Sequence, residues 1–263
     1  MEVVIQPDEE RAARLTALLI ARELRTNPHM VLGLATGRTM ERVYRILVEM
    51  YHTQGLDFSL CRTFNLDEYI GLPPDNPGSY RFYMNQHLFK WINIDLRNTY
   101  LPDGMAGDLN AACRRYEERI RECGGIDLQL LGIGKGGHIG FNEPLSSLLS
   151  RTRDKALTPT TIAQNEKLFP NPADMPRRAL TMGVGTILEA RRIVTLITGA
   201  SKADIIARAI EGPITSMVSA SALQLHANCR VIVDTEAASK LQGTEYYHWI
   251  FDNEPEWAEF RNL

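Results

Sequence analysis

The chain has 263 residues, of which 44% are hydrophobic and 23% are charged, so it is long enough to bury a full core. Its formal net charge is −3 and its acidic and basic residues are interleaved, which argues against nucleic acid or an anionic membrane as the main partner. The first ten residues lack the features of a signal peptide and no apolar run could span a bilayer, so we expect a soluble cytoplasmic protein.

Segments with helical and strand patterns alternate from one end of the chain to the other. Asp8 is expected to cap a helix over residues 8–25 that has acidic residues in its first turn. In residues 109–123 apolar side chains recur at intervals of three and four, which predicts one helical face. Further helices are expected after residue 39 and from Ser201, as the cap, to Gly212. The predicted strands are residues 30–35, 60–66, 126–133, 193–198 and 229–234.

Strands that alternate with helices imply mostly parallel pairing through right-handed crossovers. We therefore predict an α/β fold, with a doubly wound, mostly parallel, Rossmann-like sheet that has helices on both faces. Residues 1–263 are expected to form a single domain. A polar segment of residues 150–178, rich in Thr, Pro and Asn, is a candidate mobile lid or a static surface excursion.

A glycine-rich loop follows the predicted strand of residues 126–133 and is the most informative stretch of the sequence. It holds five glycines around Lys135 and His138. Glu143 follows five residues after His138, and the proline after it favours an extended, fixed backbone at the glutamate. A histidine aimed by a nearby acid is the arrangement of general acid–base catalysis. The carboxyl end of a strand is also where open α/β sheets bind ligands.

Three strand-to-helix turns carry groups suited to an anion. Residues 36–39, Thr-Gly-Arg-Thr, place backbone amides and two hydroxyls at a helix N-terminus. Residues 198–202 bring a cap hydroxyl and Lys202, and residues 183–186 form a third, glycine-rich turn. Lys202 alone could equally be a solvated lysine at a helix start, but three such turns at one sheet edge predict a site for a small anion. None of them has a dinucleotide or ATP fingerprint.

The four cysteines are scattered, with no CxxC pair and no spacing typical of zinc. We expect them to be reduced thiols, and we expect no metal centre. They are Cys61, Cys113, Cys123 and Cys229.

With these motifs the chain resembles the glucosamine-6-phosphate deaminase family, also called the glucosamine/galactosamine-6-phosphate isomerase family, along nearly its whole length. The resemblance is carried by residues 32–37, 64–69, 132–144 and 181–186. It implies a hydrolase that isomerises and deaminates glucosamine 6-phosphate to fructose 6-phosphate and ammonia in amino-sugar catabolism. It also implies that no metal or organic cofactor is needed.

The resemblance implies a role for each of three candidate catalytic residues. Asp67 matches the base that moves a proton between C1 and C2, His138 matches the residue that shuttles a proton during ring opening, and Glu143 matches the carboxylate that supports it. Adjacent strand residues point apart, so only one of Asp67 and Glu68 should face the site, and the resemblance selects Asp67. The positions that match the phosphate ligands are Thr36, Gly37, Arg38, Thr39, Lys167 and Lys202.

Two positions depart from the family pattern. Gly136 stands where relatives carry Asp or Asn, two residues before His138, so a side chain that could orient the histidine is missing. Lys167 stands where some members carry arginine, and lysine keeps the charge without the bidentate fork. We expect these changes to affect the rate and the phosphate affinity rather than the class of reaction.

Some bacterial members of the family are hexamers activated by N-acetylglucosamine 6-phosphate. Ser146, Arg153 and Lys155 match the positions that bind the phosphate of this activator, although the same residues could form a solvated basic loop. The resemblance thus implies an amino-sugar phosphate as small-molecule partner and a homo-oligomer that could be a hexamer.

Three alternatives remain open. A deaminase or isomerase for galactosamine 6-phosphate differs only at C4 of the sugar, which the sequence does not resolve. A sugar-phosphate lactonase is disfavoured by Asn142, Glu143 and the loop at Asp67. A non-catalytic sugar-phosphate sensor would find support in Gly136, but the predicted helix at residue 8 leaves no room before it for a DNA-binding segment.

Overall fold

The computed structural model describes residues 1–169 and 171–261, and its centre is a parallel β-sheet. Within these residues seven strands pair side by side, every pair parallel. In their order across the sheet they are β1 (Glu2–Gln6), β10 (Cys229–Asp234), β9 (Arg192–Ile197), β6 (Leu128–Leu131), β2 (Val31–Leu34), β3 (Arg62–Asn65) and β5 (Thr99–Tyr100). The middle strands read as continuous apolar runs because both faces of the sheet are covered.

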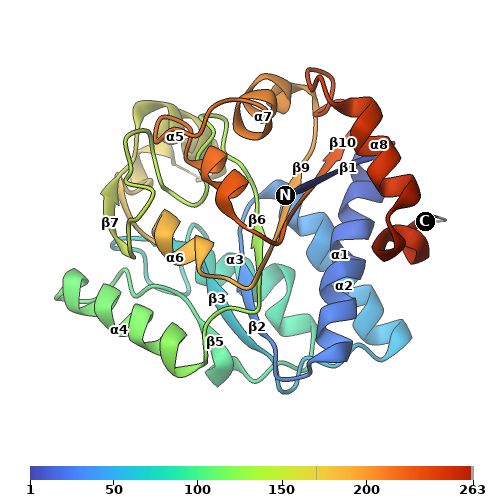
Figure 1. The fold of residues 1–263 in the computed structure, drawn as a ribbon. Helices are drawn as coiled ribbons and strands as arrows, with labels where there is room; N and C mark the ends of the chain where they lie inside the picture. The colour runs from blue at the N-terminus through green and yellow to red at the C-terminus, as the bar shows by residue number, and fades with distance from the viewer. Residues whose placement is uncertain (170, 262–263) are drawn as a thin grey trace.

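Helices cover both faces of the sheet, which confirms the predicted doubly wound fold (Figure 1). On one side lie α1 (Glu9–Thr26), α2 (Arg38–Gln54) and α8 (Thr244–Asn253), and on the other lie α4 (Leu109–Glu122) and α6 (Val184–Leu188). The remaining α-helices are α3 (Tyr80–His87), α5 (Pro159–Asn165) and α7 (Ala203–Ile210). Short 3-10 turns are η1 (Phe89–Trp91), η2 (Leu96–Asn98), η3 (Glu166–Leu168), η4 (Pro172–Asp174), η5 (Ala200–Lys202), η6 (Ser219–Leu225) and η7 (Pro255–Phe260).

Each predicted strand is present, and each lies within a few residues of its predicted bounds. Asp8 caps α1 as expected, and its carboxylate accepts a hydrogen bond from the Arg11 amide. The edge strands β1 and β5 were not predicted. β5 is too short to show a pattern, and β1 is five residues that precede Pro7 and pair with β10, from the other end of the chain.

A second, antiparallel sheet stands beside the first and was not predicted. Its order is β4 (Asp67–Tyr69), β8 (Arg178–Thr181) and β7 (Arg153–Ala156). The candidate lid of residues 150–178 therefore contains β7 and α5 as well as loops, while Pro170 within it lies outside the described residues. The segment packs on a separate buried apolar cluster of Tyr69, Phe141, Leu157, Phe169, Met175 and Ala179.

The prediction that Ser201 caps a helix is wrong. Residues 200–202 form η5, α7 begins at Ala203, and no side chain caps it. Two acidic residues at the end of β10 and just after it accept from the amides of the turn instead. Asp234 accepts from the Gly199 amide and Glu236 from the Ala200 amide. The Gly199 and Ala200 amides, which were expected to be free for an anion, therefore already donate to acidic side chains.

The turn of residues 183–186 is also not an anion site at the edge of the parallel sheet. It follows β8, a strand of the second sheet. The Val184 amide donates to Ser150 Oγ and the Gly185 amide to the Ser150 carbonyl, each at 3.0 Å. Two of the amides that an anion would need are thus satisfied within the protein.

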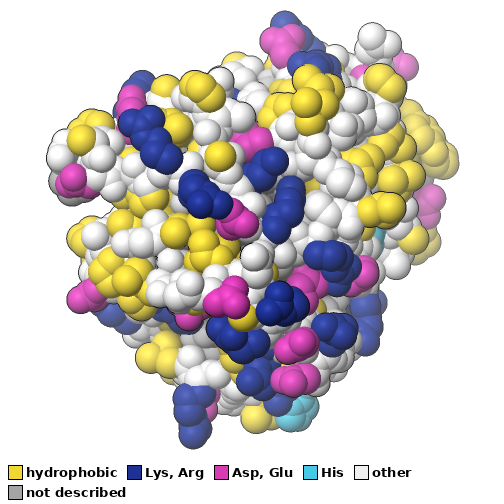
Figure 2. Space-filling model, turned by 90° about the vertical axis from the view of Figure 1, so that its left-hand side faces the viewer, with side chains coloured by type: hydrophobic (Ala, Val, Ile, Leu, Met, Phe, Trp, Pro, Cys, Tyr) yellow, Lys and Arg dark blue, Asp and Glu magenta, His cyan; other side chains and the backbone are white. Residues whose placement is uncertain are grey.

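Charges of both signs are mixed over the surface in Figure 2, where Lys and Arg side chains alternate with Asp and Glu across the lower part of the face shown. None of the helices in the described ranges is both long and apolar enough to cross a membrane.

Candidate active site

Four consecutive strands of the parallel sheet bring the predicted site residues to one edge. The strands are β9, β6, β2 and β3, and all four run in the same direction. Their carboxyl ends lead to Lys202, to the His138 loop, to residues 36–39 and to Asp67, respectively. Parallel strands end at the same edge, so residues far apart in sequence converge there.

His138 packs onto its own glycine-rich loop. A Cβ at Gly134 would lie 2.0 Å from His138 Nε2, so any larger residue at this position would displace the ring. The Gly134 amide donates to the His138 carbonyl at 2.8 Å, and the Gly134 carbonyl accepts from the Gly137 amide at 2.9 Å. These two hydrogen bonds close the turn. Gly137 has a φ of 81°, a left-handed conformation that favours glycine. The loop therefore needs its glycines to seat the histidine.

Glu143 faces His138 as predicted. His138 Nδ1 lies 3.4 Å from Glu143 Oε2, and both side chains are nearly buried. Burial acts to raise the pKa of Glu143, but contacts with His138 and Thr161 and with the Thr158 amide outweigh it and lower the pKa to about 2. Glu143 is therefore a fixed negative charge beside the ring.

Asp67 is the buried acid that the same loop approaches. Its exposed fraction is 6%, and burial together with the charge of Glu68 raises its pKa to about 8. A Cβ at Gly140 would lie 3.5 Å from Asp67 Oδ2, which places the carboxylate against the loop that carries His138. An acid with a pKa near neutrality is well matched to taking and returning a proton.

Glu68 has a different task from its neighbour. Its carboxylate accepts hydrogen bonds from the amides of Tyr69, Tyr80 and Arg81, two of which open α3. It thus fixes the start of a helix, whereas Asp67 has no such set of amide donors. The two side chains act at separate places, in agreement with the expectation that only one of them faces the site.

Lys202 and residues 36–39 flank the histidine loop. Lys202 Nζ donates to the Ile133 carbonyl at 2.6 Å, and burial, with a contribution from nearby Lys135, lowers the pKa of this ammonium to about 8. Gly37 caps α2 with a φ of 118° and without a side-chain hydrogen bond, and Thr36 and Thr39 are half-buried around it. Arg38 is exposed at the helix start. A cation beside an uncapped helix N-terminus suits a phosphate.

The other predicted residues occupy distinct places. Gly136 is exposed next to the histidine, and a Cβ there would lie 3.5 Å from His138 Nδ1. Lys167 is exposed on η3, in the candidate lid. Ser146 is buried, and Lys155 is half-buried on β7. Arg153, also on β7, donates from Nη1 to Asn142 Oδ1 at 2.9 Å.

Two polar residues that hold the histidine loop were missed as site residues. Thr181 Oγ1 accepts from the Phe141 amide at 3.0 Å, and Asn142 donates to the carbonyls of Ile139 and Met182 at 2.9 Å. Both side chains are fully buried. Their presence in the most specific sequence motifs was the available signal, but no pattern in the sequence pairs residue 141 with residue 181.

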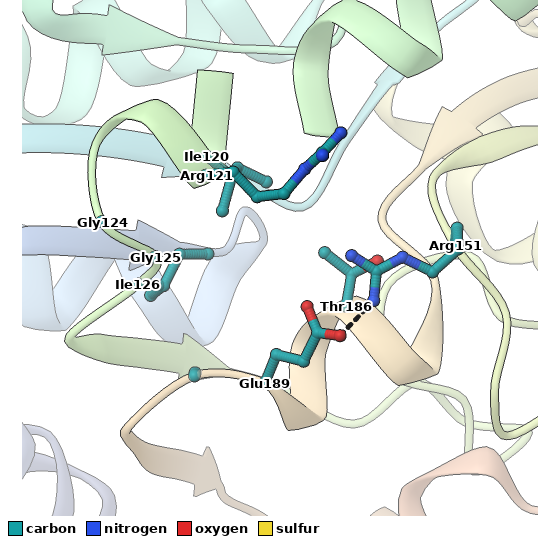
Figure 3. Close-up of a pocket in the computed structure, with 9 residues that line it drawn as sticks. Ile120, Arg121, Gly124, Gly125, Ile126, Arg151, Thr186 and Glu189 are labelled. Carbon is teal, nitrogen blue, oxygen red and sulfur yellow. Dashed lines mark hydrogen bonds and ion pairs between the residues drawn. The ribbon is translucent and has the colours of Figure 1, made fainter. Parts of the chain in front are cut away.

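A cavity of about 270 Å³ lies at the opposite, amino end of the sheet (Figure 3). Among its lining residues are Gly125, Ile126 and an ion pair between Arg151 and Glu189. The described lining includes none of the candidate catalytic or phosphate-binding residues. Among the residues with assigned coordinates, no cluster of three His, Cys, Asp or Glu side chains could hold a metal ion.

Comparisons with known proteins identify the family of the chain. Residues 8–231 match the model of the family of glucosamine-6-phosphate isomerases and 6-phosphogluconolactonases. The chain is 50% identical over 250 residues to a glucosamine-6-phosphate deaminase of Hahella chejuensis, covering 95% of each chain. It is 46% identical over 257 residues to a glucosamine-6-phosphate deaminase of an Arthrobacter species, covering 98% of this chain and 99% of the relative.

Solved structures show the same fold. A monomeric glucosamine-6-phosphate deaminase superposes with a TM-score of 0.90 at 44% identity, covering 91% of this chain and 100% of the other. The 6-phosphogluconolactonase of Trypanosoma cruzi superposes with a TM-score of 0.72 at 21% identity, covering 92% and 97%, a likeness of fold. From its sequence, its fold and the assembled edge of its sheet, the chain belongs to the family of glucosamine-6-phosphate isomerases and 6-phosphogluconolactonases.

Proposed function

We propose that this protein is an enzyme that converts glucosamine 6-phosphate and water to fructose 6-phosphate and ammonia. The observation that carries the proposal is the meeting of Asp67, the His138–Glu143 pair and Lys202 at one sheet edge. Relatives that are named glucosamine-6-phosphate deaminase and are about half identical over nearly the whole chain support the same reaction.

Ring opening is assigned to His138. It must take the proton of the C1 hydroxyl and give one to the ring oxygen as the bond between C1 and the ring oxygen breaks, which needs a group that both accepts and donates near neutral pH. Glu143, ionised because its pKa is about 2, stabilises the imidazolium between these two transfers.

Isomerisation is assigned to Asp67. In the open-chain sugar its carboxylate removes the proton from C2 and returns it to C1, while a proton passes from the amine to the C1 oxygen. This converts the aldose with an amine at C2 into a ketose imine. Burial makes Asp67 a stronger base than an exposed aspartate, because the pKa is raised to about 8. Water then adds to the imine, and ammonia leaves to give the ketone of fructose 6-phosphate.

The substrate phosphate is proposed to bind at residues 36–39 and Lys202, with Lys167 from the candidate lid as a further ligand. The N-terminus of α2 offers amides and a favourable dipole, and Lys202 supplies a partly buried positive charge. In the order of the sheet, β2 is next to β3, the strand that leads to Asp67, and β9 is three strands from it. The sugar carbon chain would therefore extend across the His138 loop, which follows β6.

The test is release of ammonia from purified protein given glucosamine 6-phosphate or, separately, galactosamine 6-phosphate. We expect release from the gluco sugar and its loss in His138→Ala. Release from the galacto sugar alone would move the assignment to the C4 epimer. Ammonia from neither sugar would refute the proposed reaction.

Regulation and assembly are finer proposals. Among the described residues, Ser146 Oγ and Arg153 Nη2 are buried without a hydrogen-bond partner, so a phosphate could bind both, with Lys155 on the same strand. We propose this as a second site for N-acetylglucosamine 6-phosphate, which would shift the substrate saturation curve. An unchanged curve would contradict it.

We also propose a cytoplasmic location and a homo-oligomer, with a hexamer as the largest expected form. The 44% identical solved deaminase is described as monomeric, so a monomer is the state to be tested against the oligomer. Sedimentation of the purified protein decides between them, and a monomer at enzyme-assay concentration would contradict the oligomer.

A further inference from the structure

Three residues that are far apart in the sequence form one row across the small antiparallel sheet. Asp67 of β4 pairs with Thr181 of β8, and Thr181 pairs with Arg153 of β7. Directly paired residues of neighbouring strands project their side chains from the same face. The proposed base, a buried threonine and a partly buried arginine thus lie side by side.

Each member of this row contacts the loop that carries His138 and Glu143. Asp67 Oδ2 lies against Gly140, Thr181 Oγ1 accepts from the Phe141 amide at 3.0 Å, and Arg153 Nη1 donates to Asn142 Oδ1 at 2.9 Å. The row therefore meets three consecutive residues of the loop. Glu143 is the next residue along.

One side chain on each side of these contacts is fully buried. Asn142 and Thr181 are each 0% exposed, so water does not compete for their hydrogen bonds. Two further hydrogen bonds fix the Asn142 side chain, because its Nδ2 donates to the Ile139 and Met182 carbonyls. With Nδ2 committed to these carbonyls, the Arg153 guanidinium meets the remaining Oδ1. Removing one partner would leave a buried polar group unsatisfied and free the loop to shift.

We propose that Thr181 and Arg153 are positioning residues that fix the His138–Glu143 pair at its working distance from Asp67. Neither needs to touch the substrate. Thr181 acts through the Phe141 amide and Arg153 through the Asn142 side chain. The inference rests on the proposed function, since it concerns the geometry between the base and the ring-opening pair.

The arrangement predicts an effect on kcat rather than on KM. Apart from Lys167 on η3, the proposed phosphate ligands lie on the loops after β2 and β9 of the parallel sheet, away from the strands that form the row. A loop that shifts relative to Asp67 would misalign the proton transfers while leaving the phosphate anchor intact. Loss of folded protein would also lower the apparent kcat at constant KM, so the rates have to be expressed per folded protein.

The experiment compares Thr181→Val, which removes the hydroxyl at nearly constant volume, with Thr181→Ser, which restores it. Arg153→Met removes the guanidinium. Arg178→Met is the matched control. Arg178 is an exposed arginine of the same sheet that forms an ion pair with Asp154, and it lies outside the row. Ammonia release is measured with glucosamine 6-phosphate and expressed per folded protein.

We expect kcat to fall about tenfold in Thr181→Val and Arg153→Met with KM within twofold of the parent, because a misplaced general acid–base pair loses part of its 10²–10⁴-fold effect. Thr181→Ser and Arg178→Met should match the parent. The double variant should fall less than the product of the single effects, since both act on one loop. Unchanged kcat in both folded single variants, or no rescue by serine, would overturn the inference.

A second measurement is independent of activity. Amide hydrogen exchange of residues 139–143 should speed at least about tenfold in Thr181→Val and not in Arg178→Met, because the Phe141 amide loses its acceptor. Equal exchange in both variants would overturn the positioning role even if the enzyme proved inactive on both amino-sugar phosphates. Failure of the proposed function would appear separately, as an inactive parent protein with a protected loop.

Discussion

The two sheets contribute to the site in different ways. The parallel sheet presents the proposed phosphate ligands other than Lys167 on loops that follow its strands, at a single edge. The antiparallel sheet presents side chains from within its strands, with Asp67, Thr181 and Arg153 in one row. Loops allow close approach to a phosphate, whereas a row of paired strands fixes distances between side chains. In this proposal the parallel sheet binds the substrate phosphate, and the antiparallel sheet fixes the distances between the catalytic side chains.

The difference extends to the acids. Asp67 is buried with few polar partners, so burial and the charge of Glu68 raise its pKa to about 8. Glu143 is also buried, but His138, Thr161 and Thr158 supply partners that lower its pKa to about 2. Two carboxyl groups beside the same loop are therefore suited to opposite tasks, one to move a proton and one to remain charged.

The largest effect is expected for Asp67→Asn, which should lower kcat about a thousandfold because an amide cannot accept the carbon-bound proton. It should also raise thermal stability at pH 8. The pKa of Asp67 is raised in the folded state, so its stabilising contribution is present at low pH and is lost as pH rises from about 4 to 8. The melting temperature of both proteins between pH 4 and 8 checks this, and parallel curves would contradict the buried acid.

The next effect concerns the parallel sheet. Lys202→Met should raise KM for glucosamine 6-phosphate about 10- to 100-fold, the value of a charge-assisted hydrogen bond, with a smaller change in kcat. Steady-state kinetics of Lys202→Met and Thr181→Val, measured side by side, compare the change in KM with the change in kcat. If both variants changed the same kinetic constant, the separation of binding from geometry would be wrong.

A buried acid on α4 supports the edge of the small sheet. Glu117 accepts hydrogen bonds from Thr152 and Thr186 and pairs with Arg151, just before β7. Burial acts to raise the pKa of Glu117, but these contacts outweigh it and lower the pKa. Glu117→Gln should reduce the free energy of unfolding by about 2–4 kcal/mol at pH 7, because Arg151 and Thr152 lose a charged partner.

Urea denaturation measures this loss, with the exposed neighbour Glu118→Gln as the control. A lowered folded-state pKa means that the stabilisation is present at neutral pH and is lost as pH falls through that pKa. The two proteins should therefore converge in stability under acid conditions. A constant difference at all pH values would show that packing rather than charge is responsible.

The same contrast explains what the sequence could predict. The middle strands of the parallel sheet are apolar runs bounded by glycines and polar turns, so they were found to within a few residues, together with the loops at their ends. The strands of the small sheet have three or four residues, and β7 reads Arg-Asp-Lys-Ala with no fully buried position. Their pairing depends on contacts between distant segments, which leave no local pattern.

Individual residues show the same limit. His138 and Glu143 lie in one short motif, so their contact could be expected from the sequence. The choice between Asp67 and Glu68 required a resemblance, because it depends on the three amides that Glu68 captures from Tyr69 and α3. Ser201 failed as a cap because Asp234, at the end of β10, and Glu236, just after it, already accept from the Gly199 and Ala200 amides of its turn.

The smallest effect is expected at Gly136, where the chain departs from its family. A Cβ at this position would lie 3.5 Å from His138 Nδ1, an ordinary contact, and within the described residues this nitrogen has no aligned hydrogen-bond partner. Gly136→Asp should therefore increase kcat about two- to fivefold, the value of one added hydrogen bond, with KM unchanged.

Gly136→Ala is the control, because it adds the Cβ without the acid. Gly134→Ala gives the opposite case, since its Cβ would meet the histidine ring at 2.0 Å and should abolish activity. Equal rates for the aspartate and alanine variants at residue 136 would show that Glu143 alone orients His138. A higher kcat in the aspartate variant alone would show that the small sheet fixes the position of the loop, while the His138 ring still lacks one hydrogen-bond partner.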